Sequence, residues 1–440
     1  MATGTQKVQP KKEIPLYVRI FIALGIGIAF GYVLNMMGGT HNPVINSYIL
    51  PFLQFLGDFF IKLIKMVIVP LVFFCIVDAA LSLGDINKLR SIGVTTIIWF
   101  LATGMISAMI GLFWVNLIQP GKGLQLGTVT GGVKAKELPG MYQTILDFIP
   151  DNPFASLSTG SMMQIIVFSL FIGFAIISLG KKAEPLGKIF NMLSMAMFKI
   201  VDYVIAIIPV GVFGLMATTM TKYGTAIFGP VLKFILTDYL ACLTTTFGVY
   251  TLLLAFVARV NVITFWKKAF SSWLVAFSTC TSSAALPVSM DIAPNKMGAP
   301  KDISSFILPL GCTAQMNGTC AYFAVVILFA AQLYGVDLSL TQQVLLCVQA
   351  TFLSVGCAAT PQIGLVISLT LMTQMGLPLD GYSLVAGIYR IVDQIHTATN
   401  SVGDLVATLC ISNMQHELDH QKFDDLSLIG QSAPQDDEVV

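Results

Sequence analysis

Long apolar runs separated by short polar stretches make up most of this chain of 440 residues. Because a helix that crosses a lipid bilayer needs about 20 apolar residues, the runs predict transmembrane helices. Six of them lie at about 15–36, 50–83, 94–119, 160–180, 194–220 and 228–260. The second run begins with Asp58, Lys62 and Lys65 at helical spacing and is longer than one perpendicular crossing, so we expect it to be tilted.

From residue 263 to 415 the chain stays apolar but is interrupted four times. "FSTCTSSAALPVSM" gathers small polar residues before Pro287, "TAQMNGTC" contains Gly318, and "SVGCAATPQIG" contains a proline and two glycines. The last interruption is "DQIHTATNSVGD", from Asp393 to Asp404. Non-helical backbone is tolerated at membrane depth only inside protein or beside a wet cavity.

Lysine and arginine residues gather in alternate loops, which the positive-inside rule places in the cytoplasm. They precede the first run and follow the second, fourth and sixth: Lys7, Lys11, Lys12, Arg19, Lys88, Arg90, Lys181, Lys182, Lys188, Arg259, Lys267 and Lys268. The long, Gly-rich loop after the third run also carries lysines, but the rule weakens there. We expect residues 1–14 to be a cytoplasmic N-terminus and the acidic tail, 416–440, to be a solvated cytoplasmic extension.

The same charges predict two re-entrant hairpins. The Ser-rich piece has Lys267 and Lys268 before it and Lys296 and Lys301 after it, so both of its ends are cytoplasmic. The Gly/Pro piece lies between "YGVDLSL" and "MGLPLDG", which carry no basic residue, so both of its ends are external. A segment whose ends share one side has not crossed. Two opposed broken segments indicate inverted repeats with a binding site near the midplane.

The composition agrees with an all-α polytopic membrane protein in contact with lipid. The chain is 55% hydrophobic and 11% charged, whereas a soluble domain carries about 25% charged residues. A net charge of +1 gives no indication of nucleic-acid binding. The eight cysteines lie in apolar segments without a C-x-x-C pair, so we predict neither a disulfide framework nor a cysteine metal site.

The last interruption forms a polar stripe. On a helix, Asp393, Thr397, Asn400 and Asp404 fall within about 60° of one another, at about 100° per residue. An ionised residue at mid-bilayer costs about 2.5–3.5 kcal/mol, so an amino group or a cation is the natural partner of these acids. The Ser/Thr-rich hairpin tip would offer N–H groups to a carboxylate, and the break at "MNGT" would offer carbonyl oxygens to a hard cation such as Na⁺.

These motifs resemble the dicarboxylate/amino acid:cation symporters, which include archaeal aspartate transporters and animal excitatory amino acid transporters. "SSAALPVSM" resembles the first hairpin of that family, "LPLGCTAQMNGT" its broken seventh helix, "GCAATPQIG" its second hairpin and "DQIHTATNSVGD" its eighth helix. "KMVIVPLVF", "IQPGKG" and "IPDNPFASLSTG" resemble earlier landmarks. The resemblance covers essentially the whole chain.

The resemblance implies eight transmembrane helices, two opposed hairpins and a homotrimer that works as an elevator. The scaffold would comprise 15–84 (helices 1 and 2) and 140–222 (helices 4 and 5), and the transport domain 91–119 (helix 3) and 228–415. Within the latter we expect hairpin 1 at about 263–292, helix 7 at about 303–335, hairpin 2 at about 341–375 and helix 8 at about 381–415. The expected location is a cell membrane, as in a bacterial plasma membrane, with both termini cytoplasmic.

Substrate contacts are implied position by position. Asp393 should hold an α-amino group, Asn400 with Ser282 and Ser283 an α-carboxylate, and Thr319 the substrate side chain. Thr360, Gly364, His396 and Thr397 complete the predicted substrate site.

Two cation sites are implied as well. Asp404 and carbonyls of Gly311, Gln315 and Asn400 would form one; carbonyls of Thr313, Ser354, Val355 and Cys357 would form the other. Asn317 stands where the family usually has an aspartate that helps to bind a third sodium ion, and Phe100 and Gly104 replace two of its hydroxyl partners. We therefore expect Na⁺ coupling with a third site absent or altered, which leaves fewer sodium ions or a proton as alternatives.

His396 is the second departure from the family. Members that carry acidic substrates usually have an arginine here, which grips a carboxylate with a planar fork, and Cys280 stands where other members have an arginine. We therefore predict a neutral or polar amino acid as substrate. The alternative is an acidic amino acid or dicarboxylate anchored by a cationic His396 or by Arg390.

Two other classes of protein also place acids in membranes. An intramembrane aspartyl protease needs two facing carboxylates, whereas Asp393 and Asp404 share one helix about 16 Å apart at about 1.5 Å per residue, so we predict no enzyme. An anion-conducting channel is the more serious alternative. It would pass an ohmic current without concentrating a solute.

Overall fold

The computed structural model describes residues 16–82, 90–123, 146, 149–355, 363–379 and 382–429. Within these ranges the backbone forms helices joined by turns and loops, and no strand occurs there. The chain is therefore all-helical in its described part, as the apolar runs predict.

The helices follow the predicted order. Their bounds are α1 (Leu16–Met36), α2 (Leu50–Ser82), α3 (Arg90–Ile118), α5 (Pro153–Thr159), α6 (Met162–Ser178), α7 (Glu184–Tyr223), α8 (Phe228–Leu243), α9 (Tyr250–Leu253), α10 (Val262–Thr279), α11 (Ser282–Lys296), α12 (Lys301–Ala314), α13 (Asn317–Leu333), α14 (Leu340–Val355), α15 (Ile363–Gln374), α16 (Tyr382–Met414) and α17 (His420–Asp424). Short 3₁₀ or π turns are η1 (Gly39–His41), η2 (Ile45–Ile49), η3 (Gly180–Ala183), η4 (Gly224–Ile227), η5 (Thr244–Val249), η6 (Leu254–Ala258) and η7 (Leu426–Leu428).

Among the described residues, four helical stretches are long and apolar enough to cross a membrane: Val18–Met36, Ile92–Ile118, Ala206–Ala258 and Lys301–Leu333. Helices α2 and α16 have 33 residues each, which is about 50 Å at about 1.5 Å per residue. Both interrupted pieces form helix pairs, α10 with α11 and α14 with α15. The number of crossings and the opposed entry of the two hairpins remain predictions.

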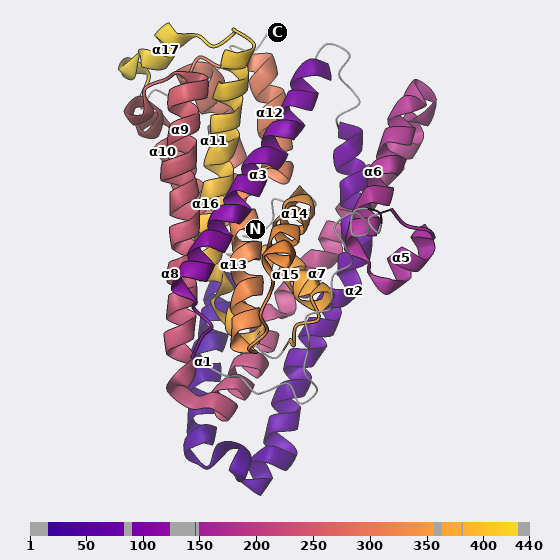
Figure 1. The fold of residues 1–440 in the computed structure, drawn as a ribbon, viewed down its shortest axis with the longest axis vertical. Coiled ribbons are helices and arrows are strands. Elements are labelled where there is room, and N and C mark those ends of the chain that lie inside the picture. The colour runs from indigo at the N-terminus through magenta and orange to yellow at the C-terminus, as the bar shows by residue number, and fades with distance from the viewer. Residues whose placement is uncertain are drawn as a thin grey trace, which may run out of the picture.

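Two groups of helices pack within the bundle (Figure 1). In one, α2 runs along α6 and α7, and α1 runs along α7. In the other, α16 contacts α8, α10, α11, α12 and α13, while α3 crosses α13 and α8 obliquely. The first group contains segments expected in the scaffold and the second contains segments expected in the transport domain. The division into two domains stays a prediction.

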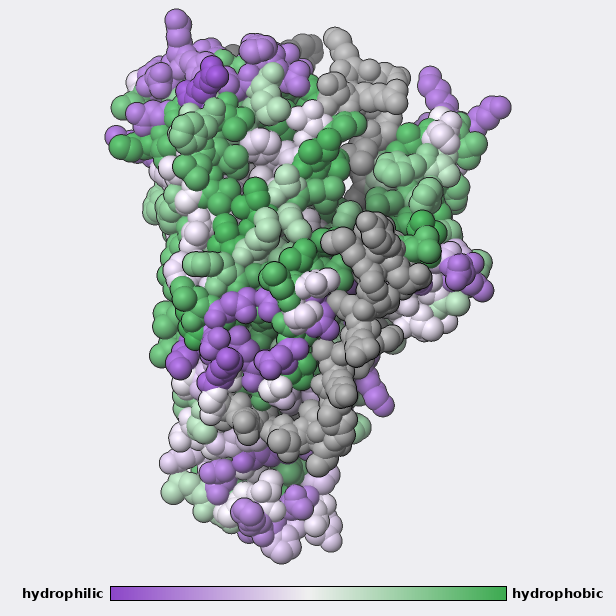
Figure 2. Space-filling view, viewed as in Figure 1, coloured by the Kyte–Doolittle hydropathy of each residue, from purple (hydrophilic) through white to green (hydrophobic). Residues whose placement is uncertain are grey.

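Apolar side chains fill the interior and also cover much of the exterior. Every residue of α13 except Gln332 is buried, so this helix forms the centre of the second group. Figure 2 shows broad apolar areas on the face of the molecule drawn there, with hydrophilic side chains gathered near α17 and toward the opposite end. Exposed Phe52, Phe55 and Phe59 on α2 belong to this exterior. Such a surface suits lipid rather than water.

The start of the C-terminal tail differs from the expected solvated extension. Leu418 and Phe423 are buried, and the Lys268 ammonium on α10 donates to the carbonyls of Phe423 and Lys296, both at 2.6 Å. A buried ammonium needs such partners. Most of the described tail is exposed. The docking of Leu418 and Phe423 was not predicted, because two apolar residues do not stand out in an acidic stretch. Residues 430–440 lie outside the described part.

Candidate functional site

The polar stripe lies inside the second group of helices. Asp393, Thr397, Asn400 and Asp404 are each 4–6% exposed, on the side of α16 that meets the first hairpin and the α12–α13 break. The hydroxyl of Thr397 donates to Oδ1 of Asp393 at 3.4 Å. The sequence therefore identified one continuous buried polar surface.

The break between α12 and α13 is held by Asn400. Gln315 and Met316 leave the helical conformation, with φ/ψ of −96°/82° and −108°/53°. The N–H of Gly318 donates to Oδ1 of Asn400 at 2.7 Å, and Nδ2 of Asn400 donates to the hydroxyl of Thr319 at 3.2 Å. One amide thus satisfies a donor freed by the break and places Thr319 beside the stripe.

Asp404 is the carboxylate with the least compensation in this region. Its Oδ1 is buried without a hydrogen-bond partner among the described residues, as are both side-chain polar atoms of Gln315. A Cβ added to Gly311 would lie 2.3 Å from that Oδ1, so the carboxylate lies directly against the α12 backbone. The Gly311 carbonyl accepts one bond, from the N–H of Gln315 at 2.8 Å. The carbonyls that follow it in the last turn have no intrahelical donor. An acid and amide oxygen beside such carbonyls are the ligands that a hard cation prefers, so the residues fit a bound Na⁺.

Only part of the second predicted cation site lies within the described residues. The hydroxyl of Thr313 donates to the carbonyl of Leu310 at 3.1 Å, and that of Ser354 to the carbonyl of Thr351 at 2.7 Å. Val355 is the last described residue of α14. Cys357 and Thr360, at the tip of the second hairpin, lie outside the described residues, so this site stays a prediction.

Asn317 is fully engaged by protein groups. Its Nδ2 donates to the Tyr250 hydroxyl at 2.9 Å. Its Oδ1 lies 3.3 Å from the Thr103 hydroxyl, which also lies 2.8 Å from the Trp99 carbonyl. Gly104 lies beside this amide, because a Cβ there would lie 3.7 Å from Oδ1 of Asn317. Glycine has no side chain and so offers no hydroxyl. The Asn317 amide is uncharged and has protein partners at both ends, so no bound cation is required to balance it.

The tip of the first hairpin lies near the start of the stripe. Ser282, buried, and Ser283, exposed, begin α11, and Cys280 closes α10 with a positive φ of 55°. Arg390 reaches this tip from α16, where its Nη2 donates to the carbonyl of Thr279 at 3.0 Å. A helix N-terminus with a guanidinium nearby is suited to an anionic group.

Helix α15, the second arm of the predicted second hairpin, packs near Thr319 and Tyr389. A Cβ on Gly364 would lie 2.3 Å from the Tyr389 hydroxyl oxygen and 3.4 Å from Thr319 Cγ2. Glycine therefore allows α15 to pack closely against the region of the break. The structure brings Gly364, Thr319 and Asn400 together, and their role as substrate contacts stays a prediction.

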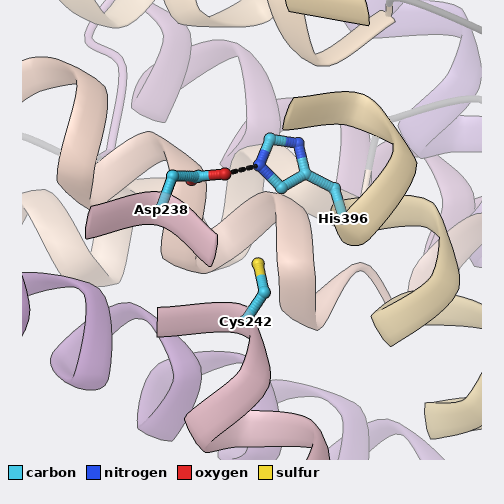
Figure 3. A group of neighbouring side chains, drawn as sticks. All are labelled: Asp238, Cys242 and His396. Atoms are coloured by element: carbon cyan, nitrogen blue, oxygen red, sulfur yellow. Dashed lines mark hydrogen bonds and ion pairs between the residues drawn. The ribbon is translucent and has the colours of Figure 1, made fainter. Parts of the chain in front are cut away.

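The side chain of His396 points toward α8. Its Nε2 lies 2.6 Å from Oδ2 of Asp238 on α8, and the two side chains are 1% and 0% exposed (Figure 3). The imidazole also packs beside the rings of Tyr322 and Tyr389, with centroid distances of 4.8 and 6.1 Å. The sequence placed His396 toward the substrate side chain, but here its polar edge faces another protein helix.

Cys242 lies one turn from Asp238 and close to the pair (Figure 3). One ligand atom from each of Asp238, Cys242 and His396 lies within 4.8 Å of the others, and nitrogen, oxygen and thiolate ligands suit zinc. The short contact between Asp238 and His396, however, already satisfies one atom of each. The geometry therefore favours a hydrogen-bonded pair over a metal centre.

Asp238 is the residue that sequence reasoning missed. It lies within the apolar run at 228–260, in "LTDYLACL", and an ionisable residue within a transmembrane segment is a functional candidate by default. What no pattern could provide was its partner, because 158 positions separate it from His396.

Comparisons with known proteins agree with the motif assignments. The model of the family described as "Sodium:dicarboxylate symporter family" matches residues 16–414. The chain is 32% identical over 422 residues to a proton/sodium-glutamate symport protein of Bacillus caldotenax, covering 93% of this chain and 97% of that protein. It is 33% identical over 419 residues to a proton/glutamate-aspartate symporter of Escherichia coli, covering 92% and 94%. It is also 30% identical over 435 residues to a C4-dicarboxylate transport protein of Azorhizobium caulinodans, covering 96% and 94%.

Proposed function

Because the chain belongs to the sodium:dicarboxylate symporter family, we propose that it is a secondary active symporter that takes up a small amino acid or dicarboxylate by coupling to a cation gradient. Membership of this family makes it a multi-pass membrane transporter and not an enzyme. The relatives are named for glutamate, aspartate or C4-dicarboxylates, with protons or sodium as coupling ions.

The observation that carries the proposal is the Asp404 carboxylate against the α12 backbone. Its Oδ1 has no hydrogen-bond partner in the described part of the chain, and it lies beside Gly311 and near the break in helix 7. A buried charge without a resident partner is costly. A bound cation would offset that cost and would tie the site to the gradient that drives uptake.

The substrate would bind between the hairpin tips and α16. Asp393 would accept the α-amino group, while Ser282, Ser283 and Asn400 would bind the α-carboxylate. Since His396 is paired with Asp238, a neutral or polar side chain is favoured. Arg390 at the hairpin tip supports the second candidate, an acidic amino acid or dicarboxylate.

The coupling ion would be sodium, in fewer copies than is usual for the family, or a proton. The support for a missing third site is Asn317, whose two polar atoms already bond to Tyr250 and Thr103. Thr313, Ser354, Val355 and Cys357 would supply the second site, closed by the second hairpin.

We infer the elevator from the two helix groups and the family. The group containing α3, α8, α10–α13 and α16 would slide with both hairpins as the transport domain, against a trimeric scaffold of α1, α2, α6 and α7. Both termini would be cytoplasmic. Movement of a closed site distinguishes this mechanism from an anion-conducting channel.

The deciding experiment uses purified protein in sealed liposomes. Uptake of a panel of labelled neutral and acidic amino acids and dicarboxylates would be measured with an inward Na⁺ gradient, an inward proton gradient, or neither. The proposal expects accumulation above equilibrium with one of the gradients. A passive current without accumulation would instead establish the channel.

A further inference from the structure

Asp238 has no role in the proposed binding of substrate or cation, yet it is among the most buried ionisable groups in the described structure. It projects from α8 and contacts His396 at 2.6 Å, with 0% of its side chain exposed. Burying two ionisable groups is expensive, and replacing such a pair by apolar residues often costs nothing. A gain in folding stability therefore does not explain why Asp238 and His396 are buried together.

We propose that Asp238 is a positioning residue that sets the side-chain specificity of the transport site by holding His396 and offsetting its charge. This inference rests on the proposed function. His396 follows Asp393 by three residues and lies beside the stripe. The resemblance assigns this position to contact with the substrate side chain, but here its polar edge is turned toward Asp238.

The charge balance explains the expected selectivity. An arginine at residue 396 would offer a permanent positive charge and a planar fork to a second carboxylate. A histidine whose Nε2 faces a carboxylate at 2.6 Å offers no net positive charge, because any charge on the imidazole is offset by Asp238. A dicarboxylate would also bring its second acid toward the carboxylate of Asp393. Rejection of a competitor by like charge is one of the two ways to build specificity.

The surroundings keep the pair in this arrangement. Tyr322 packs on the imidazole and donates to, or accepts from, the Ser368 hydroxyl at 3.1 Å. Gly318 meets the His396 backbone so closely that a Cβ added to this glycine would lie 2.5 Å from the His396 carbonyl oxygen. A side chain confined in this way has little freedom to turn toward a ligand. Removing the carboxylate would therefore leave the imidazole in this place without the charge that offsets it.

The test compares uptake of acidic and neutral amino acids, as the ratio of their kcat/KM values, in liposomes. Asp238→Asn is expected to raise the acidic-to-neutral ratio by about tenfold or more, the scale of a charge contact in a desolvated site. His396→Gln should not raise it, and Asp238→Asn added to His396→Gln should leave the ratio unchanged, since the effect acts through the imidazole. Cys242→Ala is the matched control one turn away and should keep the wild-type ratio.

A second pair of variants tests the charge offset with a guanidinium in place of the imidazole. His396→Arg alone should shift the ratio toward acidic substrates less than His396→Arg with Asp238→Asn, because Asp238 offsets the guanidinium in the former. Equal ratios in these two variants would overturn the proposal, as would a wild-type preference for acidic substrates. An equal loss of all uptake in Asp238→Asn would assign the pair a structural role.

Two further outcomes would separate the proposal from a metal site and from a failure of the proposed function. If EDTA and Cys242→Ala each reproduced the shift of Asp238→Asn, the cluster would be a metal site and the proposal would be wrong. If the wild-type protein accumulated no solute under any gradient, the proposed function itself would fail. Purified protein would then still report on Asp238, through binding of the same amino acids by calorimetry.

Discussion

Asp238 and Asp404 are two buried carboxylates of the same helix group, 0% and 4% exposed, with different partners. Oδ2 of Asp238 has an imidazole nitrogen at 2.6 Å, while its Oδ1 is buried without a hydrogen-bond partner among the described residues. Asp404 has an Oδ1 without a hydrogen-bond partner among the described residues, and it faces the α12 backbone at Gly311. One acid is compensated by a permanent protein group, and the other lacks such compensation.

The difference indicates two uses of a charge in a membrane protein. A carboxylate with a resident partner has the same partner throughout transport. It can therefore fix the position and offset the charge of a neighbouring side chain. A carboxylate without one is costly until a ligand arrives, so its energy changes with the cation. The contrast predicts that equivalent substitutions at the two acids have different, and in part opposite, effects.

The largest effect is expected for Asp404→Asn. Loss of one partner of a buried charge pair costs about 2–5 kcal/mol, which corresponds to about 30-fold or more in cation affinity. Cation-driven uptake in liposomes should therefore fall by at least that factor. Asp337→Asn, on an exposed residue, is the control for the chemical change. Unaltered cation dependence in Asp404→Asn would remove Asp404 from the site.

A smaller loss is expected for Gly311→Ala. The new Cβ would lie 2.3 Å from Oδ1 of Asp404, so the carboxylate must move while its charge is kept. We expect cation affinity to fall by about tenfold, which corresponds to about 1.4 kcal/mol, as measured by calorimetry or by the sodium dependence of uptake. Gly25→Ala is the matched control, because no heavy atom lies within 4 Å of the added Cβ. Equal affinities in both variants would show that the Asp404 position is not critical.

Thermal unfolding without cation then separates the two acids. Asp238→Asn weakens a charge-assisted hydrogen bond worth about 1.5–3 kcal/mol, so its Tm should fall. Asp404→Asn removes an uncompensated charge, so its Tm should stay level or rise, and the increase in Tm on adding cation should disappear. Parallel falls in Tm for the two variants would mean that Asp404 has a resident partner after all.

The same contrast explains which features were predictable from sequence. Hydropathy located α1, α2, α3, α6, α7 and α8 and the interruptions, because lipid and helical periodicity impose a local pattern. The stripe from Asp393 to Asp404 and the break at Gly318 were identified for the same reason. The direction of the His396 side chain was not, because it depends on Asp238 from a distant segment. Docking of Phe423 beneath α10 also depends on a long-range contact, with Lys268.

The smallest effect is expected at the exposed ion pair between Glu184 and Lys188, 2.8 Å apart and 62% and 71% exposed. A hydrogen bond from Lys188, and then its charge, hold the pKa of Glu184 below its ordinary value of 4.5. Any stabilisation by this pair is thus present at neutral pH and is lost as the pH falls below 4.5 through the lowered pKa.

Because water and salt screen such pairs, Glu184→Gln should leave both Tm and uptake at pH 7 unchanged within error. Asp238→Asn, which also removes one acid from an ion pair, should lower Tm under the same conditions. A fall in Tm for Glu184→Gln as large as that for Asp238→Asn would mean that burial does not distinguish the two pairs. The interpretation of Asp238 as a desolvated partner of His396 would then lose its physical basis.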